Sequence, residues 1–163
     1  MRITWTRQCS PFLIGIIVAT VCSGAGAEDW PEVQGKGRRG VWNETGILET
    51  FPVGGLDVKW RTPIHGGYAG PAVADGRVFV SDFKPTRVRR GEERVICLDA
   101  KAGKILWTFQ DGATNYGWLG YARGPRATPT VDGGRASVRG AGGPPYWHDV
   151  KTGKKIRPSD SQK

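Results

Sequence analysis

The sequence predicts an all-β protein, and three observations support this prediction. Gly accounts for 25 of the 163 residues, about twice its usual share, and Pro for another 11. Short runs of strand-forming residues alternate with Asp-Gly and Gly-Lys turns. Past the first thirty residues, no window of a dozen residues carries the apolar stripe of an amphipathic helix. The chain therefore reads as many short strands joined by turns.

The N-terminus resembles a secretory signal peptide. A positively charged start precedes the apolar run at residues 11–21, and "AGA" at residues 25–27 supplies a small-x-small cleavage pattern. We expect residues 1–27 to be removed before Glu28, which predicts a periplasmic or secreted protein. The alternative is an uncleaved anchor, the only membrane attachment that the sequence predicts.

Charge and cysteine content exclude several kinds of function. The formal net charge is +9. The basic cluster at residues 87–94 contains two Glu and lies between strand-like runs, so we expect a solvated loop and no nucleic-acid partner. Removal of residues 1–27 leaves Cys97 as the only thiol, in an apolar run. A small buried hydrophobe is the favoured interpretation of Cys97, over a catalytic thiol.

No motif for metal or hydrolytic chemistry is found. His65 and His148 are far apart and have no companions at metal-ligand spacing. The sequence contains no Gly-x-Ser-x-Gly, and its Gly-rich stretches do not lead from a strand into a helix. We therefore predict no catalytic residue and no metal site.

Two segments of the chain resemble two later ones. "PAVADGRVFV" at residues 71–80 aligns with "PTVDGGRASV" at residues 129–138, and "DAKAGKI" at residues 99–105 aligns with "DVKTGKKI" at residues 149–156. The second pair is more closely spaced than the first. A longer hairpin loop, "KPTRVRRGE", in the first copy explains the difference. The chain thus contains a repeated unit.

Each unit is predicted to hold four antiparallel strands. In the first unit, two strands flank Asp75-Gly76, a strong hairpin signal, and two more flank the Asp-x-x-x-Gly turn at residues 99–103. Asp99 can accept N–H bonds at the turn entrance, and Gly103 can adopt a positive φ. Such a sheet needs a neighbouring unit to bury its second face. We expect Trp107, on the outermost strand, to pack against the Gly turn of the adjacent unit.

The stretch "CLDAKAGKILW" at residues 97–107 resembles the tryptophan-docking motif of pyrroloquinoline-quinone (PQQ)-type β-propeller repeats. The family pattern is Ala-x-Asp-x-x-Thr-Gly-Lys-x-x-Trp. Four positions match, namely Asp99, Gly103, Lys104 and Trp107, whereas Cys97 replaces Ala and Ala102 replaces Thr. The resemblance implies the propeller fold and extends over about residues 40–156.

The second copy of the motif lacks the docking Trp. It keeps Asp149, Thr152, Gly153 and Lys154, but Trp147 replaces Ala and Arg157 stands where the docking Trp should be. Pro and Gly precede it in place of an apolar strand, so we expect residues 136–163 to be poorly ordered.

An additional strand is expected upstream of the first unit. "DVKWRTPI" at residues 57–64 resembles an outer strand with its own Trp60, of the kind that completes the last blade of a propeller. The predicted fold is a partial β-propeller with one intact blade, one degraded blade and this N-terminal closing strand. The predicted divisions are a signal peptide at 1–27, an N-terminal extension at 28–55, propeller repeats at 56–157 and a disordered tail at 158–163.

The family resemblance implies two functional alternatives. Its dehydrogenase branch holds PQQ with calcium, but the Cys-Cys pair and active-site carboxylates of that branch have no match here. Its non-catalytic branch binds partners. We therefore predict an exported, non-catalytic protein with a binding or scaffold role. The resemblance implies a full ring of about six to eight blades, so we expect the chain to be a truncated member or a fragment. Open blade edges predict protein partners or self-association. The alternative is a remnant of a PQQ-dependent dehydrogenase.

One loop is a candidate ligand site. Residues 115–129 join the two units and contain aromatic and basic side chains: Tyr116, Trp118, Arg123 and Arg126. Aromatic rings with Arg can hold an anionic or planar ligand. The competing interpretation is a packed connection in which Arg126 donates to backbone carbonyls.

Overall fold

The computed structural model describes residues 27–156, except for residues 89, 118–122 and 142. The signal-peptide prediction, apart from Ala27, and the predicted tail lie outside the described residues. Within the described ranges, no helix is both long and apolar enough to cross a membrane.

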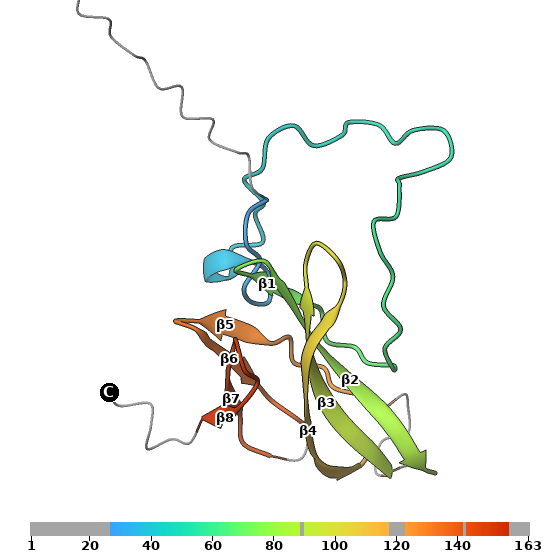
Figure 1. Ribbon diagram of the computed structural model, residues 1–163, viewed down its shortest axis with the longest axis vertical. Coiled ribbons are helices and arrows are strands. Elements are labelled where there is room, and N and C mark those ends of the chain that lie inside the picture. Colours follow the sequence, from blue (N-terminus) through green and yellow to red (C-terminus); the bar gives the residue numbers. More distant parts are fainter. Residues whose placement is uncertain (1–26, 89, 118–122, 142, 157–163) are drawn as a thin grey trace, which may run out of the picture.

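Two four-stranded antiparallel sheets form the body of the molecule (Figure 1). The strands of the first sheet, in spatial order, are β1 (Ala72–Ala74), β2 (Arg77–Arg87), β3 (Arg90–Asp99) and β4 (Ile105–Asn115). Those of the second are β5 (Thr130–Asp132), β6 (Arg135–Val138), β7 (Tyr146–Asp149) and β8 (Lys155–Ile156). In the described part of the chain, the one helical element is the 3-10 turn η1 (Lys36–Arg38). The all-β prediction is confirmed, and each sheet has the strand order of a propeller blade.

The first hairpin forms at the predicted Asp-Gly turn. Asp75 and Gly76 have φ values of 51° and 69°, the left-handed pair that a two-residue hairpin turn requires. The next hairpin differs from the prediction, because β2 and β3 continue through most of the expected loop at residues 84–92. Lys84 faces Glu92 in this extension, and opposite charges in register favour strand pairing.

The second sheet corrects the expectation of poor order for residues 136–156, apart from residue 142, whereas residues 157–163 lie outside the described residues. Residues 136–156 contain most of β6 and all of β7 and β8, and Tyr146 and Trp147 supply β-propensity where apolar residues were expected. Backbone pairing with β6 does not require an apolar strand. The sheet is nevertheless smaller than the first, since its longest strands have 4 residues and those of the first have 11. This agrees with a degraded blade.

The core lies between the two sheets. Its buried members come from both: Ala72, Ala74, Phe79, Cys97, Val131, Ala136 and Val150, with Trp107 packed against them. Cys97 is fully buried, and burial raises the pKa of its thiol to about 11. The thiol is therefore protonated near neutral pH, which agrees with the buried-hydrophobe interpretation.

The N-terminal segment, residues 27–44, connects the inner strands of the two sheets, β1 and β5. Trp30 and Val73 of β1 exchange two backbone hydrogen bonds of 2.8 and 2.9 Å, and the carbonyl of Pro31 accepts from the N–H of Val131 in β5 at 2.7 Å. The predicted closing strand at residues 57–64 is not part of either sheet. Its Trp60 instead contacts the first unit, as described below.

Candidate functional site

Trp107 connects the two sheets through the Gly turn of the second unit. Its indole Nε1–H donates to the carbonyl of Val150 at 3.0 Å. The ring covers Gly153, where an added Cβ would lie 2.6 Å from the Trp107 ring. Gly153 has a φ of 70°, so the turn requires glycine both for backbone conformation and for space.

Trp60 makes the same contacts with the first unit. Its Nε1–H donates to the carbonyl of Ala100 at 3.0 Å, and an added Cβ on Gly103 would lie 2.5 Å from its ring. In a closed ring, the outer strand of a last blade would make this same contact with the first blade, so the docking of Trp60 does not overturn the closing-strand prediction. The structure places Trp60 on the blade that follows it in the chain, so Trp60 and Trp107 form a series. The similar sequence separation of each Trp from its Gly turn is the signal that could have shown this.

The two turns themselves are built alike. The Asp99 carboxylate accepts the N–H groups of Lys101 and Ala102 at 3.0 and 2.7 Å, and the N–H of Gly103 donates to the Asp99 carbonyl at 2.8 Å. Lys104 contributes its carbonyl, which accepts the N–H of Asp99 at 2.8 Å, while its side chain is exposed.

The second turn repeats this pattern with Asp149 and Thr152. Asp149 accepts the backbone N–H and the hydroxyl of Thr152, both at 2.8 Å. The hydroxyl bond, the larger cause, lowers the pKa of the Asp149 carboxyl. Lys154 again provides its carbonyl, to the N–H of Asp149 at 2.9 Å. The motif residues thus build a docking surface for Trp rather than a catalytic group.

The buried carboxylate of Asp82, in the first sheet, forms an ion pair with Arg94. Asp82 has no exposed surface. It accepts from the Arg94 guanidinium, whose Nε lies at 2.8 Å and whose Nη2 reaches the second oxygen, and from the N–H of His65 at 2.7 Å. The bond to Asp82 raises the pKa of Arg94. Arg94 is therefore an internal ion-pair partner rather than part of the solvated basic loop that we expected.

A second buried carboxylate, Glu93, lies where the two units meet. It is 8% exposed, and it accepts the Tyr116 hydroxyl and the N–H of Ala141, the latter at 3.0 Å. Burial, and then the bond to Glu93, raise the pKa of Tyr116. The Tyr116 ring packs edge-on against Phe83 at 4.9 Å between centroids. The carboxylate thus connects the linker after β4 to the segment before β7.

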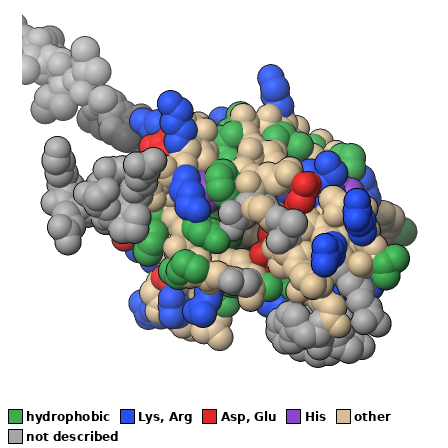
Figure 2. Space-filling model, turned by 90° about the horizontal axis from the view of Figure 1, so that it is seen from below, with side chains coloured by type: hydrophobic (Ala, Val, Ile, Leu, Met, Phe, Trp, Pro, Cys, Tyr) green, Lys and Arg blue, Asp and Glu red, His purple; other side chains and the backbone are tan. Residues whose placement is uncertain are grey.

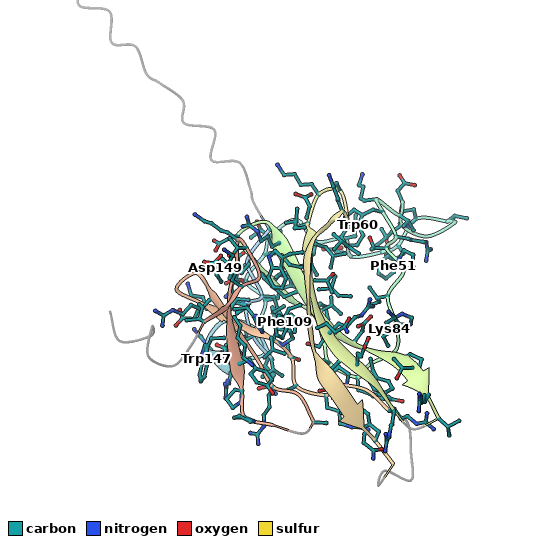
Figure 3. The ribbon with its side chains drawn as sticks, turned by 60° about the horizontal axis from the view of Figure 1, so that its bottom comes forward. Phe51, Trp60, Lys84, Phe109, Trp147 and Asp149 are labelled. Atoms are coloured by element: carbon teal, nitrogen blue, oxygen red, sulfur yellow. The ribbon has the colours of Figure 1, made fainter. Side chains whose placement is uncertain are left out.

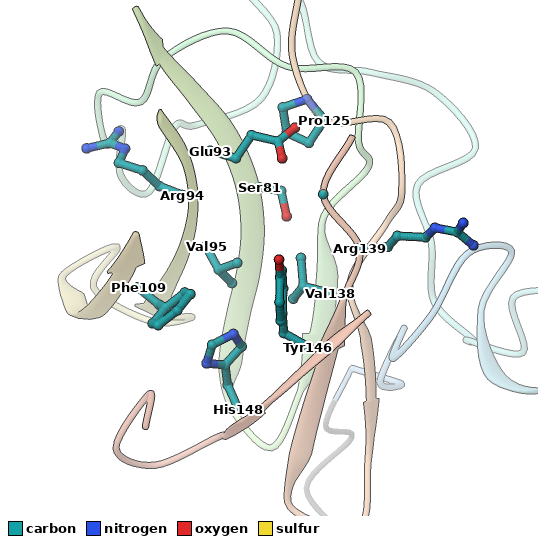
Figure 4. Close-up of a pocket in the computed structure, with 11 residues that line it drawn as sticks. Ser81, Glu93, Arg94, Val95, Phe109, Pro125, Val138, Arg139, Tyr146 and His148 are labelled. Atoms are coloured by element: carbon teal, nitrogen blue, oxygen red, sulfur yellow. The ribbon is translucent and has the colours of Figure 1, made fainter. Parts of the chain in front are cut away.

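A small cavity adjoins Glu93 (Figure 4). Its volume is about 20 Å³, which suffices for about one water molecule. Side chains of β3, β4 and β7 surround it, including Val95, Phe109 and His148. This cavity is too small for an organic substrate.

Of the four loop candidates, the three described residues Tyr116, Arg123 and Arg126 line neither the small cavity beside Glu93 nor a larger one beside the N-terminal segment. Tyr116 is buried, and Arg126 donates to the carbonyl of Gly124 at 3.0 Å and lies 5.1 Å from the centre of the Tyr68 ring. Arg123 is exposed, and Trp118 lies outside the described residues. For Tyr116 and Arg126, this geometry matches the competing interpretation, in which the loop is a packed connection between the two units.

A larger cavity lies beside the N-terminal segment. Its volume is about 540 Å³. Two tryptophans, two glutamates and apolar side chains line it, and sequence reasoning did not identify it. We call it the tryptophan pocket. Its lining includes Trp30, Trp42, Val33, Val73, Glu28 and Glu44.

A comparison with family models agrees with the repeat motif found in the sequence. A PQQ-repeat family model, described as outer membrane protein assembly factor BamB, matches residues 38–157. The chain belongs to this family. Among solved structures, this PQQ-type repeat chain is similar to a europium-containing methanol dehydrogenase, with 21% identity and a TM-score of 0.43. The similarity covers 62% of this chain and only 18% of that protein. No curated protein matches the chain.

The described residues do not fit the PQQ and calcium that the family resemblance implies. Calcium takes about six to eight oxygen ligands, and the described part of the chain contains no group of three His, Cys, Asp or Glu residues placed to hold a metal ion. The charged residues lining the tryptophan pocket are both acidic, and they would repel an anionic quinone.

Proposed function

We propose that this chain is an exported, non-catalytic PQQ-type repeat protein that acts by binding, and that a second copy of the chain is its partner. The main support is the exposed apolar surface of a segment at residues 45–58, which we call the apolar arm. Six large apolar side chains of the arm are exposed: Ile47, Leu48, Phe51, Val53, Leu56 and Val58. Phe51 is 75% exposed.

The arm stands away from both sheets (Figure 1) and belongs to neither. Figure 3 shows Phe51 on this segment, on the far side of β2 from the second sheet. Water-exposed apolar side chains gathered on one segment are typical of a surface that another chain covers. Burial of such side chains is favourable by about 1.5–3 kcal/mol each. Their gathering therefore supports a binding role.

The charges favour a second copy as the covering chain. The arm carries Glu49 and Asp57 and no Lys or Arg. The second unit is basic: residues 130–156 hold Arg135, Arg139, Lys151, Lys154 and Lys155 against only Asp132 and Asp149. Figure 2 shows Lys and Arg side chains distributed over one face of the molecule. An acidic, apolar arm is complementary to that basic unit.

Self-association is tested by light scattering after size exclusion of the purified protein. We expect an oligomer whose dissociation constant rises with salt, because complementary charges are screened. Ile47→Ser with Phe51→Ser and Leu56→Ser should give a monomer with an unchanged circular dichroism spectrum. Val88→Ser, at a side chain 84% exposed outside the arm, is the matched control. A monomeric parent protein at high concentration would refute the proposal.

The non-catalytic part of the proposal has its own test. The protein is mixed with PQQ and calcium and assayed for cofactor absorbance and for dye-linked oxidation of alcohols and sugars. We expect neither stoichiometric binding nor turnover. An active, stoichiometric holoenzyme would establish the dehydrogenase alternative instead.

A further inference from the structure

We propose that the tryptophan pocket binds an organic cation, namely a substituted or quaternary ammonium group on a small apolar body. The pocket lies between the N-terminal segment and the start of β1, where Glu28, Trp30, Trp42 and Glu44 meet Val73. It is separate from the apolar arm and from the Trp-docking turns, and so the proposal is independent of the proposed function.

A preformed aromatic wall lines part of the pocket. Trp30 is held through its backbone to Val73 and through its ring to Gly35, where an added Cβ would lie 2.7 Å from the indole. Trp42 meets it edge-on, with 6.2 Å between ring centroids and 64° between planes. Trp42 is 62% exposed, so its ring remains accessible. Indole faces attract cations by about 0.5–2 kcal/mol, depending on desolvation.

The side chains that line the pocket carry negative charge. Among the described residues that line the pocket, Glu28 and Glu44 are the only charged ones, and both are partly buried. The Glu28 carboxylate accepts the N–H of Asn43 at 3.1 Å, and that of Glu44 accepts the N–H of Glu28 at 2.6 Å. Among the described residues, neither takes part in an ion pair. Two uncompensated carboxylates beside aromatic rings favour a cation over an anion or a neutral molecule.

The size and the apolar lining of the pocket suit a small organic ligand. A volume of about 540 Å³ lies within the usual range of about 300–1,000 Å³ for small-molecule sites. Val33, Pro71 and Val73 add apolar surface, which suits alkyl groups on nitrogen. A bare metal ion would instead require several oxygen ligands.

Signal-peptide removal would change the charge of the pocket without reversing it. Cleavage before Glu28 would turn its backbone nitrogen into an ammonium group next to the Glu44 carboxylate. That ammonium offsets one of the two negative charges, and the pocket keeps a net charge of −1. Glu28 then remains as the carboxylate available to the ligand.

The test titrates the full chain with choline and with 3,3-dimethylbutan-1-ol, its uncharged analogue of nearly the same shape. Binding is followed by calorimetry and tryptophan fluorescence. We expect saturable choline binding that is at least about tenfold tighter than binding of the alcohol, a difference of about 1.4 kcal/mol. Equal affinity for the two probes, or no saturable choline binding, would overturn the proposal.

Variants then assign the binding to this pocket. Trp42→Ala, and Glu28→Gln combined with Glu44→Gln, should each weaken choline binding at least about tenfold. Trp147→Phe changes another partly exposed tryptophan, on β7, and should leave choline binding unchanged. Choline binding that survives both pocket variants would refute the assignment.

Discussion

Trp107 of the first sheet lies directly on Gly153 of the second, in the space where a side chain on residue 153 would begin. The same indole donates its N–H to the carbonyl of Val150. One residue thus provides both an apolar contact and a directional bond between the units. The stability of the pair of units should therefore depend on this contact.

Trp107→Ala should lower the free energy of unfolding by about 3–5 kcal/mol, since it removes a packed indole and leaves a cavity between the sheets. Urea denaturation measures the change. Leu106→Ala, at the neighbouring residue of β4 whose side chain is 44% exposed, is the control and should have a much smaller effect. Equal losses in the two variants would show that Trp107 does not join the units.

Gly153→Ala should destabilise through two separable causes, the positive φ and the contact with Trp107. Gly134→Ala is the matched control, because Gly134 has a φ of 77° and nothing within 4 Å of an added Cβ. The loss at Gly153 should exceed that at Gly134, and it should shrink in a Trp107→Ala background. Strict additivity of the two substitutions would contradict contact between them.

Tyr116→Phe should cost about 1–3 kcal/mol, because it removes a donor from the buried Glu93 carboxylate. Glu93→Gln with Tyr116→Phe should cost less than the sum of the single losses, since the double variant leaves no charged acceptor without its donor. Thermal unfolding measures each variant. Tyr68→Phe, at an exposed tyrosine, serves as the control. An unchanged thermal stability of Tyr116→Phe would mean that the Tyr116 hydroxyl does not hold the linker after β4 in place.

Stability should fall as the pH rises from about 8.5 toward the raised pKa of Cys97, about 11. The folded state keeps the Cys97 thiol protonated, whereas the unfolded state releases that proton above the ordinary thiol pKa of about 8.5. The stabilisation that the protonated thiol gives the folded state is therefore complete below about pH 8.5. It is lost as the pH rises from there toward the folded-state pKa of about 11. Urea titrations of the parent and of Cys97→Ala should diverge there. Parallel pH profiles would refute the prediction.

Sequence patterns identified the elements with local causes. The Asp75-Gly76 and Asp99-to-Gly103 turns were predicted because their conformations depend on residues close together in the chain. Trp107 was predicted as the contact between units because the repeat implied a neighbouring Gly turn. The extension of β2 and β3 past residue 84 was missed, since pairing of Lys84 with Glu92 becomes favourable only once the strands are in register.

The sequence by itself determined the all-β class, the repeat and the Trp-docking motif, because turn chemistry and strand propensity act over a few residues. Only the tertiary structure decided that Arg94 and Tyr116 donate to buried carboxylates, and that a tryptophan pocket exists. Each of these depends on contacts between segments far apart in the chain. Such contacts follow from how the sheets pack, which no local pattern encodes.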